Sequence, residues 1–328
     1  MAHRNDLATA VADGDRGALA RAITLVESQR PADKAAAEQL LTTLLPRTGG
    51  ALRVGITGAP GVGKSTLIEA LGMQLCDAGR RVAVLAVDPS STVSGGSILG
   101  DKTRMDQLSR RPEAFIRPSP GGGTLGGVAS RTQEAMLLCE AAGFDVVLVE
   151  TIGTGQSEVA VHDMVDFFLL LLSPAAGDEL QGIKRGVMEL CDGVLVNKAD
   201  GDLIAAANAT AQQCTLAMRV LHAGEANPPS VRTASATTGE GLSELWREIE
   251  STLARSRADG RFTQRRQQQA VRWLERSVRE GLQALFEADG QIRTALASAK
   301  AKVAAGELVA TAAANDLLRQ WRNRCSAG

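Results

Sequence analysis

The segment GAPGVGKST at residues 58–66 decides the fold, because it matches the pattern G-x-x-x-x-G-K-[ST] at every position. The apolar run RVGIT at 53–57 precedes it and indicates a strand, while the following residues, 66–72, indicate a helix. A strand, a glycine-rich loop and a helix in this order predict a phosphate-binding loop, in which backbone N–H groups and the helix dipole surround a phosphate. The alternative is a glycine-rich turn that binds nothing, and the flanking strand and helix argue against it.

This loop is expected to supply contacts to the nucleotide and to its metal ion. Lys64 would place a positive charge at the β- and γ-phosphates, and the Ser65 hydroxyl is placed to hold Mg²⁺. The residues of the loop that we predict to bind the nucleotide are Gly61, Val62, Gly63, Lys64, Ser65 and Thr66.

A second motif predicts which base is bound. The apolar run 193–196 is followed by N-K-x-D at 197–200, at a strand's carboxyl edge, where open α/β sheets bind ligands. The Asp200 carboxylate can accept hydrogen bonds from guanine N1–H and the 2-amino group, the Lys198 stem can cover the base, and Asn197 can tie the two loops together. Adenine lacks these donors, and leaving the carboxylate unpaired costs about 1–3 kcal/mol, so the site is predicted to select GTP over ATP.

A third segment completes the predicted base site. Ser235 and Ala236 follow the strand-like run 230–234 and can offer a backbone N–H to guanine O6. A polar turn after a strand is the alternative for both base-binding segments.

Two further apolar runs end in carboxylates that are placed to contact Mg²⁺, directly or through water. The run 82–87 ends at Asp88, and 145–150 ends at Glu150, which opens an E-T-I-G segment similar to the D-x-x-G of GTPases. Gly153 in this segment can give its N–H to the γ-phosphate because no side chain blocks the approach. A turn or helix-cap role is the alternative for Asp88.

Many signalling GTPases carry a glutamine after this glycine to orient the attacking water. Here the position is Thr154, and Gln156 lies two residues further on. We therefore expect slow hydrolysis by the isolated protein, on the order of 10⁻⁴ to 10⁻² per second, with a partner or a moving loop completing the site.

Composition narrows the class of protein. The 328 residues include 36 basic and 37 acidic side chains, a net charge of −1, so no strong field attracts nucleic acid or a membrane. The five cysteines include no C-x-x-C pair, and no apolar segment of signal length begins the chain. Reduced thiols in a cytoplasmic protein are expected.

Residues 51–258 alternate short apolar runs with helical stretches, the pattern of a parallel sheet with helices on both faces. The predicted fold is α/β: a P-loop NTPase with a mainly parallel central sheet and helical extensions at both ends. We expect a helical extension at 1–50, the GTPase domain at 51–258 and a helical arm at 259–328. The expected strands are 53–57, 82–87, 114–117, 145–150, 167–172, 193–197 and 230–234.

Several longer stretches resemble the MeaB/ArgK group of GTPases. The resemblance covers nearly the whole chain and is densest over 53–200. The stretches that carry it are GITGAPGVGKST at 55–66, VAVLAVDPSS at 82–91, GGSILGDKTRM at 95–105, FIRPSP at 115–120, GTLGGVA at 123–129, LLCEAAGFDVVLVETIGTGQSE at 137–158, GDELQGIKRG at 177–186 and NKAD at 197–200.

The resemblance implies an accessory chaperone of adenosylcobalamin-dependent acyl-CoA mutases. Such proteins use GTP to gate loading of the cofactor onto the mutase and to protect the mutase from inactivation. They form homodimers, which makes the arm at 259–328 the expected dimerisation element; packing of this arm on the core is the alternative. The mutase stimulates their low GTPase activity. A further expected partner is the adenosyltransferase that supplies the cofactor.

The resemblance also implies three switch segments, at 88–104, 150–154 and 174–184. Asp101 in the first and Lys184 in the third are expected to enter the site when the mutase binds, and Asp101 also to contact Mg²⁺. The expected catalytic set is Lys64, Asp101, Glu150 and Lys184. From the residues alone, the third segment is equally compatible with an ordinary strand-to-helix connection in which Asp178 caps a helix.

Two other functions remain as alternatives. A nickel-delivery GTPase would need Cys or His ligands near the nucleotide, and the three histidines are scattered along the chain. A GTP-dependent kinase would need an acceptor site, for which no carboxylate cluster is evident.

Overall fold

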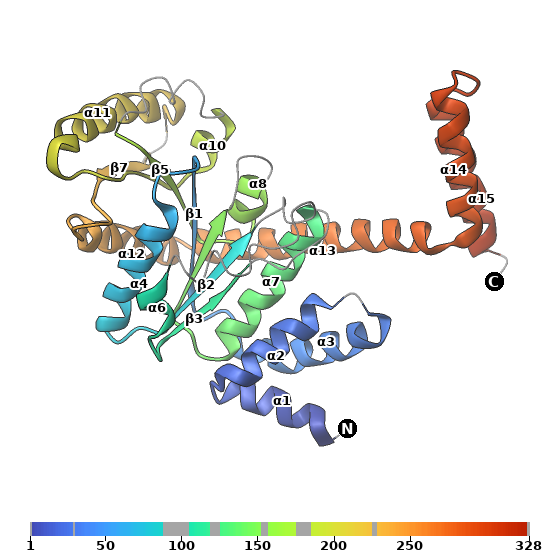
Figure 1. Ribbon diagram of the computed structural model, residues 1–328, viewed down its shortest axis with the longest axis horizontal. Coiled ribbons are helices and arrows are strands. Elements are labelled where there is room, and N and C mark those ends of the chain that lie inside the picture. The colour runs from blue at the N-terminus through green and yellow to red at the C-terminus, as the bar shows by residue number, and fades with distance from the viewer. Residues whose placement is uncertain are drawn as a thin grey trace. The chain divides into compact units, whose positions relative to one another are not determined.

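Seven parallel strands in the order β3-β2-β4-β1-β5-β6-β7 form one sheet (Figure 1). The computed structural model describes residues 2–28, 30–87, 105–118, 125–151, 157–174, 185–224 and 228–326. The strands are β1 (Leu52–Gly58), β2 (Val82–Val87), β3 (Ala114–Arg117), β4 (Val146–Thr151), β5 (Phe167–Leu172), β6 (Gly193–Val196) and β7 (Ser230–Thr233). Each lies within one residue, at either end, of the range predicted from the sequence, and the α/β fold is confirmed.

The helices follow the predicted alternation. In the order of the chain they are α1 (Ala2–Ala12), α2 (Arg16–Glu27), α3 (Pro31–Leu44), α4 (Lys64–Asp77), α6 (Asp106–Ser109), α7 (Leu125–Ala141), α8 (Ser157–His162), α10 (Arg185–Leu190), α11 (Ile204–Leu221), α12 (Leu242–Ala258), α13 (Arg261–Ala288), α14 (Gly290–Ala304) and α15 (Ala310–Cys325). Contacts divide the chain into two compact units, residues 1–269 and 270–328, and the division falls inside α13. The functional arm expected at 259–328 stays a prediction.

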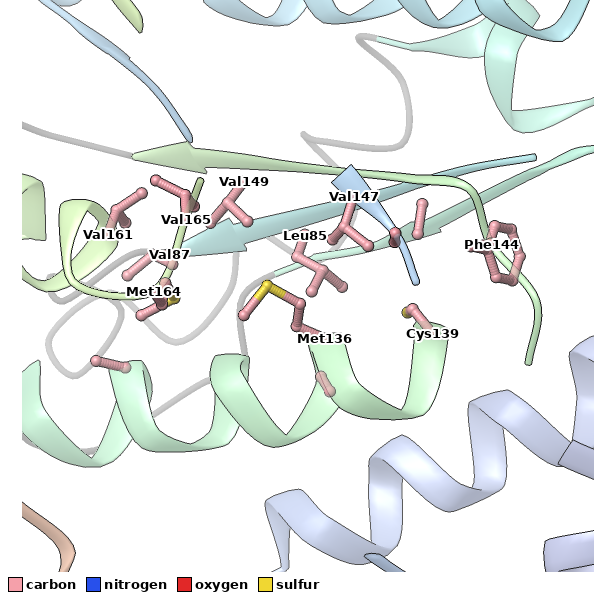
Figure 2. Close-up of a cluster of buried hydrophobic side chains, with 14 of the residues drawn as sticks. Leu85, Val87, Met136, Cys139, Phe144, Val147, Val149, Val161, Met164 and Val165 are labelled. Carbon is pink, nitrogen blue, oxygen red and sulfur yellow. The ribbon is translucent and has the colours of Figure 1, made fainter. Parts of the chain in front are cut away.

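The sheet is covered on both faces, which is why its strands are continuous apolar runs. In β4, Val147 and Val149 belong to one hydrophobic cluster, and Val146 and Leu148 belong to the other. Figure 2 shows the first cluster, where Met136 and Cys139 of α7 lie against side chains of the sheet. Helices α4, α6 and α12 contribute to the second cluster.

Aspartates fix the amino ends of three strands. Asp145, Asp166 and Asp192 stand directly before β4, β5 and β6. The Oδ2 of Asp145 accepts the N–H of Arg81 at 2.7 Å, and the Oδ2 of Asp166 accepts that of Arg53 at 2.9 Å. The Oδ2 of Asp192 accepts the N–H of Phe168 at 2.8 Å. Each carboxylate thus holds the start of its own strand against a neighbouring one.

Two consecutive arginines of α13 bind these same carboxylates. Arg265 pairs with Asp192 through hydrogen bonds of 2.8 and 3.0 Å, and Arg266 pairs with Asp166 at 2.8 and 2.6 Å. Arg266 also donates to the carbonyl oxygens of Gly49 and Ala51, immediately before β1, at 2.7 Å each. The beginning of α13 is therefore bonded to the amino edge of the sheet, as part of the unit 1–269.

Four of the five cysteines behave as core residues. Cys76, Cys139, Cys191 and Cys214 are buried and unbridged, and Cys325 is exposed. Burial raises the pKa of Cys214 to about 11 and, together with the Asp192 carboxylate, that of Cys191 to about 12. These two thiols stay protonated at neutral pH and act as small apolar groups.

Candidate nucleotide site

The predicted motifs converge at the carboxyl edge of the sheet, because β1 lies between β4 and β5. The phosphate loop begins where β1 ends, Glu150 is the next-to-last residue of β4, and the N-K-x-D segment follows β6. Strands β2, β3 and β4 lie on one side of β1, and β5, β6 and β7 lie on the other. The point at which the strand order changes sides is where open α/β sheets bind ligands.

Glycine is required at two positions of the phosphate loop. Gly58 and Gly63 have φ angles of 149° and 95°, in the region that other residues rarely adopt. A Cβ on Gly58 would lie 2.5 Å from the carbonyl oxygen of Leu171, and one on Gly63 would lie 2.6 Å from Nδ2 of Asn197. The loop therefore passes too close to β5 and to the N-K-x-D segment for any side chain.

Lys64, the first residue of α4, lies against the loop. Its side chain is nearly buried, and Nζ donates to the carbonyl oxygens of Gly58 at 2.8 Å and Ala59 at 3.2 Å. This arrangement puts a positive charge at the amino end of a helix, where the helix dipole already favours anions.

Ser65 and Glu150 meet across the site. The Ser65 hydroxyl donates to Oε1 of Glu150 at 3.0 Å, and Glu150 is only 5% exposed. A hydroxyl and a carboxylate oxygen are ligands that suit Mg²⁺, so this pair fits the predicted metal position. Among the described residues, no group of three or more His, Cys, Asp or Glu side chains could hold a metal ion. The other two predicted ligands, Asp88 and Asp101, lie outside the described residues.

Asn197 joins three segments of the site. The residue is 1% exposed, and its Nδ2 donates to the carbonyl oxygen of Val62 in the phosphate loop at 2.9 Å. Its Oδ1 accepts the N–H of Ala236 at 3.1 Å. A buried amide with both ends bonded fixes the relative positions of the loops that carry it and its partners.

Lys198 adopts a conformation that is rare for its type. Its φ of 59° makes it the one non-glycine residue with positive φ in the described part of the chain, and Nζ donates to the carbonyl oxygen of Gly61 at 2.8 Å. A left-handed lysine costs roughly 1–2 kcal/mol. Such strain gathers at ligand sites, and here it directs the lysine stem toward the phosphate loop.

Asp200 is held by a serine from the next loop. The Ser235 hydroxyl donates to Oδ2 of Asp200 at 2.5 Å and accepts the N–H groups of Thr237 and Thr238 at 3.2 and 3.1 Å. We predicted that Ser235 and Ala236 offer a backbone N–H to guanine O6. In the structure the N–H of Ser235 donates to the carbonyl oxygen of Glu240 at 2.9 Å and that of Ala236 to Asn197, while the Ser235 side chain orients the Asp200 carboxylate. The motif alone gave no signal for this second function.

The structure gathers most of the predicted site residues. Lys64, Ser65, Glu150, Asn197, Lys198, Asp200, Ser235 and Ala236 are linked to one another or to the phosphate loop by the hydrogen bonds above. Thr66 is exposed on α4. The predicted residues Asp88, Asp101, Gly153 and Lys184 lie outside the described residues. The functions assigned to all of these residues stay predictions.

Sequence reasoning missed one pair at the same edge. Thr57 and Thr151 are the residues just before Gly58 and just after Glu150, and their buried hydroxyls are hydrogen-bonded at 2.9 Å. No motif contains this pair, because it forms only when β1 and β4 lie side by side.

The parallel sheet, the phosphate loop and the converging N-K-x-D segment define a P-loop GTPase. The family model described as "Methylmalonyl Co-A mutase-associated GTPase MeaB" matches residues 19–291. The chain belongs to this family, and it is a GTPase.

Known relatives agree with this assignment. A probable GTPase of Mycobacterium tuberculosis is 54% identical over 314 residues, which cover 95% of this chain and 93% of that protein. GTPase ArgK of Escherichia coli is 50% identical over 268 residues, 81% of each chain. The mitochondrial methylmalonic aciduria type A homolog of Mus musculus is 45% identical over 329 residues, 97% of this chain and 79% of that protein.

A solved structure extends the similarity to three dimensions. The crystal structure of a LAO/AO transport system kinase is 37% identical, with a TM-score of 0.77 and coverage of 98% of both chains.

Among the helices that the structure describes, none combines the length and the apolar character needed to span a bilayer.

The close approach at Gly63 gives the first prediction. Gly63→Ala would place a methyl group 2.6 Å from Asn197 Nδ2, so it should break the tie between the two loops. We expect the affinity for a GTP analogue, measured by calorimetry, to fall roughly tenfold or more.

The matched control is Gly79→Ala. Gly79 also has a positive φ, 79°, but a Cβ there would meet open space. It carries a similar backbone strain without the clash, so its affinity should remain at the wild-type value. Equal affinities for the two variants would contradict the proposed importance of the Asn197 contact.

Proposed function

We propose that this GTPase is a chaperone that gates the loading of adenosylcobalamin onto a cobalamin-dependent acyl-CoA mutase and protects the mutase from inactivation. The observation that carries the proposal is the family match, which spans the nucleotide site and continues through α13 into α14. The family description names methylmalonyl-CoA mutase, which is therefore the partner to test.

Within this function, the site binds GTP through three contacts. The phosphate loop and Lys64 hold the phosphates, and Asp200, oriented by Ser235, reads the guanine edge. Lys198, which reaches across to Gly61, covers the base. The hydrogen bond between Ser235 and Asp200 supports this interpretation, because a carboxylate with a fixed orientation can accept two parallel hydrogen bonds from guanine.

The metal ion belongs to the same proposal. Ser65 would hold Mg²⁺, with Glu150, Asp88 and Asp101 contacting it directly or through water. Bound Mg²⁺ neutralises charge that develops on the transferring phosphoryl group. The 3.0 Å contact between Ser65 and Glu150 supports their share of this function.

Hydrolysis is proposed to be slow in the isolated protein and faster with the mutase. Thr154 follows Gly153, where many GTPases have the glutamine that orients water. Asp101 and Lys184 are the groups that the mutase would bring into the site. A positively charged side chain supplied in this way stabilises charge on the γ-phosphoryl group.

A second copy of this chain is the other proposed partner. Val271, Leu274, Val278, Leu282 and Leu285 recur along α13 at intervals of three and four residues, and each is at least half exposed. This spacing places them in one stripe of the helix, as in the seam of a coiled coil. An apolar stripe of this length is typical of a helix that associates with another chain.

The mutase proposal is tested by turnover. We expect purified methylmalonyl-CoA mutase holoenzyme to raise GTP hydrolysis by roughly tenfold or more, and Lys184→Ala to remove most of that rise, because a lost cation weakens stabilisation of the transition state. Lys34→Ala, at an exposed position of α3, should be stimulated like the wild type. No stimulation of the wild-type protein would refute the mutase as the activating partner.

Base recognition is tested at Asp200. Asp200→Asn replaces one acceptor with a donor, which opposes guanine and suits xanthine, so the preference for GTP over XTP should reverse by roughly tenfold or more. Asp202→Asn, two residues further on and exposed, should keep the GTP preference. If the Asp200 variant still binds GTP better than XTP in a competition assay, Asp200 does not read the base.

The proposed dimer is tested on α13. Leu274→Asp puts a charge into the stripe, so the molar mass measured by light scattering should fall from that of a dimer to that of a monomer. Leu216→Asp on α11 is the matched control, since the two leucines are 63% and 64% exposed. A dimer that persists in the Leu274 variant, or is lost in both, would argue against this interface.

A further inference from the structure

A hydrogen bond between two buried threonines links β1 to β4 at their carboxyl ends. Thr57 is 2% exposed and Thr151 is fully buried. The Thr151 hydroxyl donates to the Thr57 hydroxyl at 2.9 Å. Ile56 is the register partner of Glu150, so the two threonines are the next residues along these neighbouring strands.

This bond lies where the sheet begins to separate. The paired register between β1 and β4 ends at Ile56 and Glu150. Beyond that point β1 stays paired with β5 as far as Gly58, while β4 stays paired with β2 through Thr151. The threonine pair therefore continues the connection between β1 and β4 one residue past the last backbone pairing, at the fork where the phosphate loop leaves β1.

Packing alone does not require hydroxyl groups at positions 57 and 151. The register partners on the outer neighbours are Leu170 for Thr57 and Val87 for Thr151, and both are buried apolar residues. Valine has nearly the shape of threonine and suits a buried parallel strand. A buried hydroxyl is tolerated when it is hydrogen-bonded, but it adds little net stability. Two such hydroxyls bonded to each other therefore indicate that the ends of β1 and β4 have to be held in a fixed relative position.

Thr57 is adjacent to the phosphate loop, and Thr151 is adjacent to a residue of the predicted metal site. Thr57 precedes Gly58, whose carbonyl oxygen accepts the Lys64 ammonium. Thr151 follows Glu150, whose Oε1 accepts the Ser65 hydroxyl. A shift between the two strand ends would move Glu150 relative to Ser65.

We propose that Thr57 and Thr151 are positioning residues that hold Glu150 opposite Ser65 at the Mg²⁺ position of the GTP site. This inference rests on the proposed function of Ser65 and Glu150 at the metal. The hydroxyl pair does not touch the nucleotide or the ion. It keeps the carboxylate of β4 and the hydroxyl of α4 at a separation that one hydrated cation can bridge.

The test uses Thr57→Val, Thr151→Val, the double variant and Thr151→Ser. Each valine variant removes the bond, so the Mg²⁺ concentration that gives half of the full gain in GTP-analogue affinity should rise roughly three- to tenfold, the effect of one hydrogen bond. Thr151→Ser keeps the hydroxyl and should behave as the wild type. Calorimetry with a non-hydrolysable analogue measures this without turnover.

Thermal unfolding separates position from stability. Each single valine variant leaves one buried hydroxyl unpaired and should be destabilised, whereas the double variant removes both partners and should recover most of the melting temperature. The shifted Mg²⁺ requirement should persist in the double variant. Thr132→Val, which removes a 3% exposed hydroxyl bonded within α7, should leave the Mg²⁺ requirement unchanged.

The outcomes separate a failure of the proposed metal site from a failure of the positioning proposal. If Mg²⁺ does not strengthen binding to the wild-type protein, the proposed metal site fails, and the positioning proposal fails with it. If the wild type responds to Mg²⁺ and the double variant matches it, the positioning proposal alone is overturned. A shift in Thr132→Val as large as that in the double variant would also overturn it.

Discussion

The nucleotide site depends on a charged contact at the opposite end of the sheet. Asp166, with its side chain 1% exposed, accepts the N–H of Arg53 in β1 and both arms of the Arg266 guanidinium. The side chain of Arg53 forms two hydrogen bonds with Glu140 of α7, at 2.8 and 2.9 Å. A buried pair of this kind loses about 3–5 kcal/mol when one partner is removed, so these contacts fix where β1 starts. The phosphate loop follows the other end of β1, so its position depends on where β1 starts.

The carboxyl edge is connected as tightly as the amino edge. Asn197 binds the phosphate loop and the loop at Ala236 together, while β6, which leads to Asn197, is fixed at its amino end by Asp192 and Arg265. The residues directly before β1 and β6, which lead to the phosphate loop and the N-K-x-D segment, are thus bonded to consecutive arginines of α13.

Sequence reasoning succeeded where the determinants are local. The strands were predicted to within one residue because a parallel sheet buried on both faces requires continuous apolar runs, and the phosphate loop is a contiguous pattern. The contacts that arrange these pieces come from residues far apart in the chain. Arg266 meets Asp166 across 100 residues, and Thr57 meets Thr151 across 94. The threonine pair depends on β4 lying beside β1, and the Arg266 pair depends on α13 reaching the start of β5; no single segment encodes either arrangement.

The glutamate at position 150 shows how such a contact constrains a motif. The D-x-x-G pattern has an aspartate where this chain has Glu150. The glutamate side chain is longer by one methylene group, a C–C bond of about 1.5 Å. Ser65 reaches Glu150 from α4, across the fork between β1 and β4, at 3.0 Å. An aspartate on the same backbone would end about one C–C bond short of this contact. The longer side chain is therefore matched to the position that the two threonines give to the end of β4, so residue type and strand position have to be understood together.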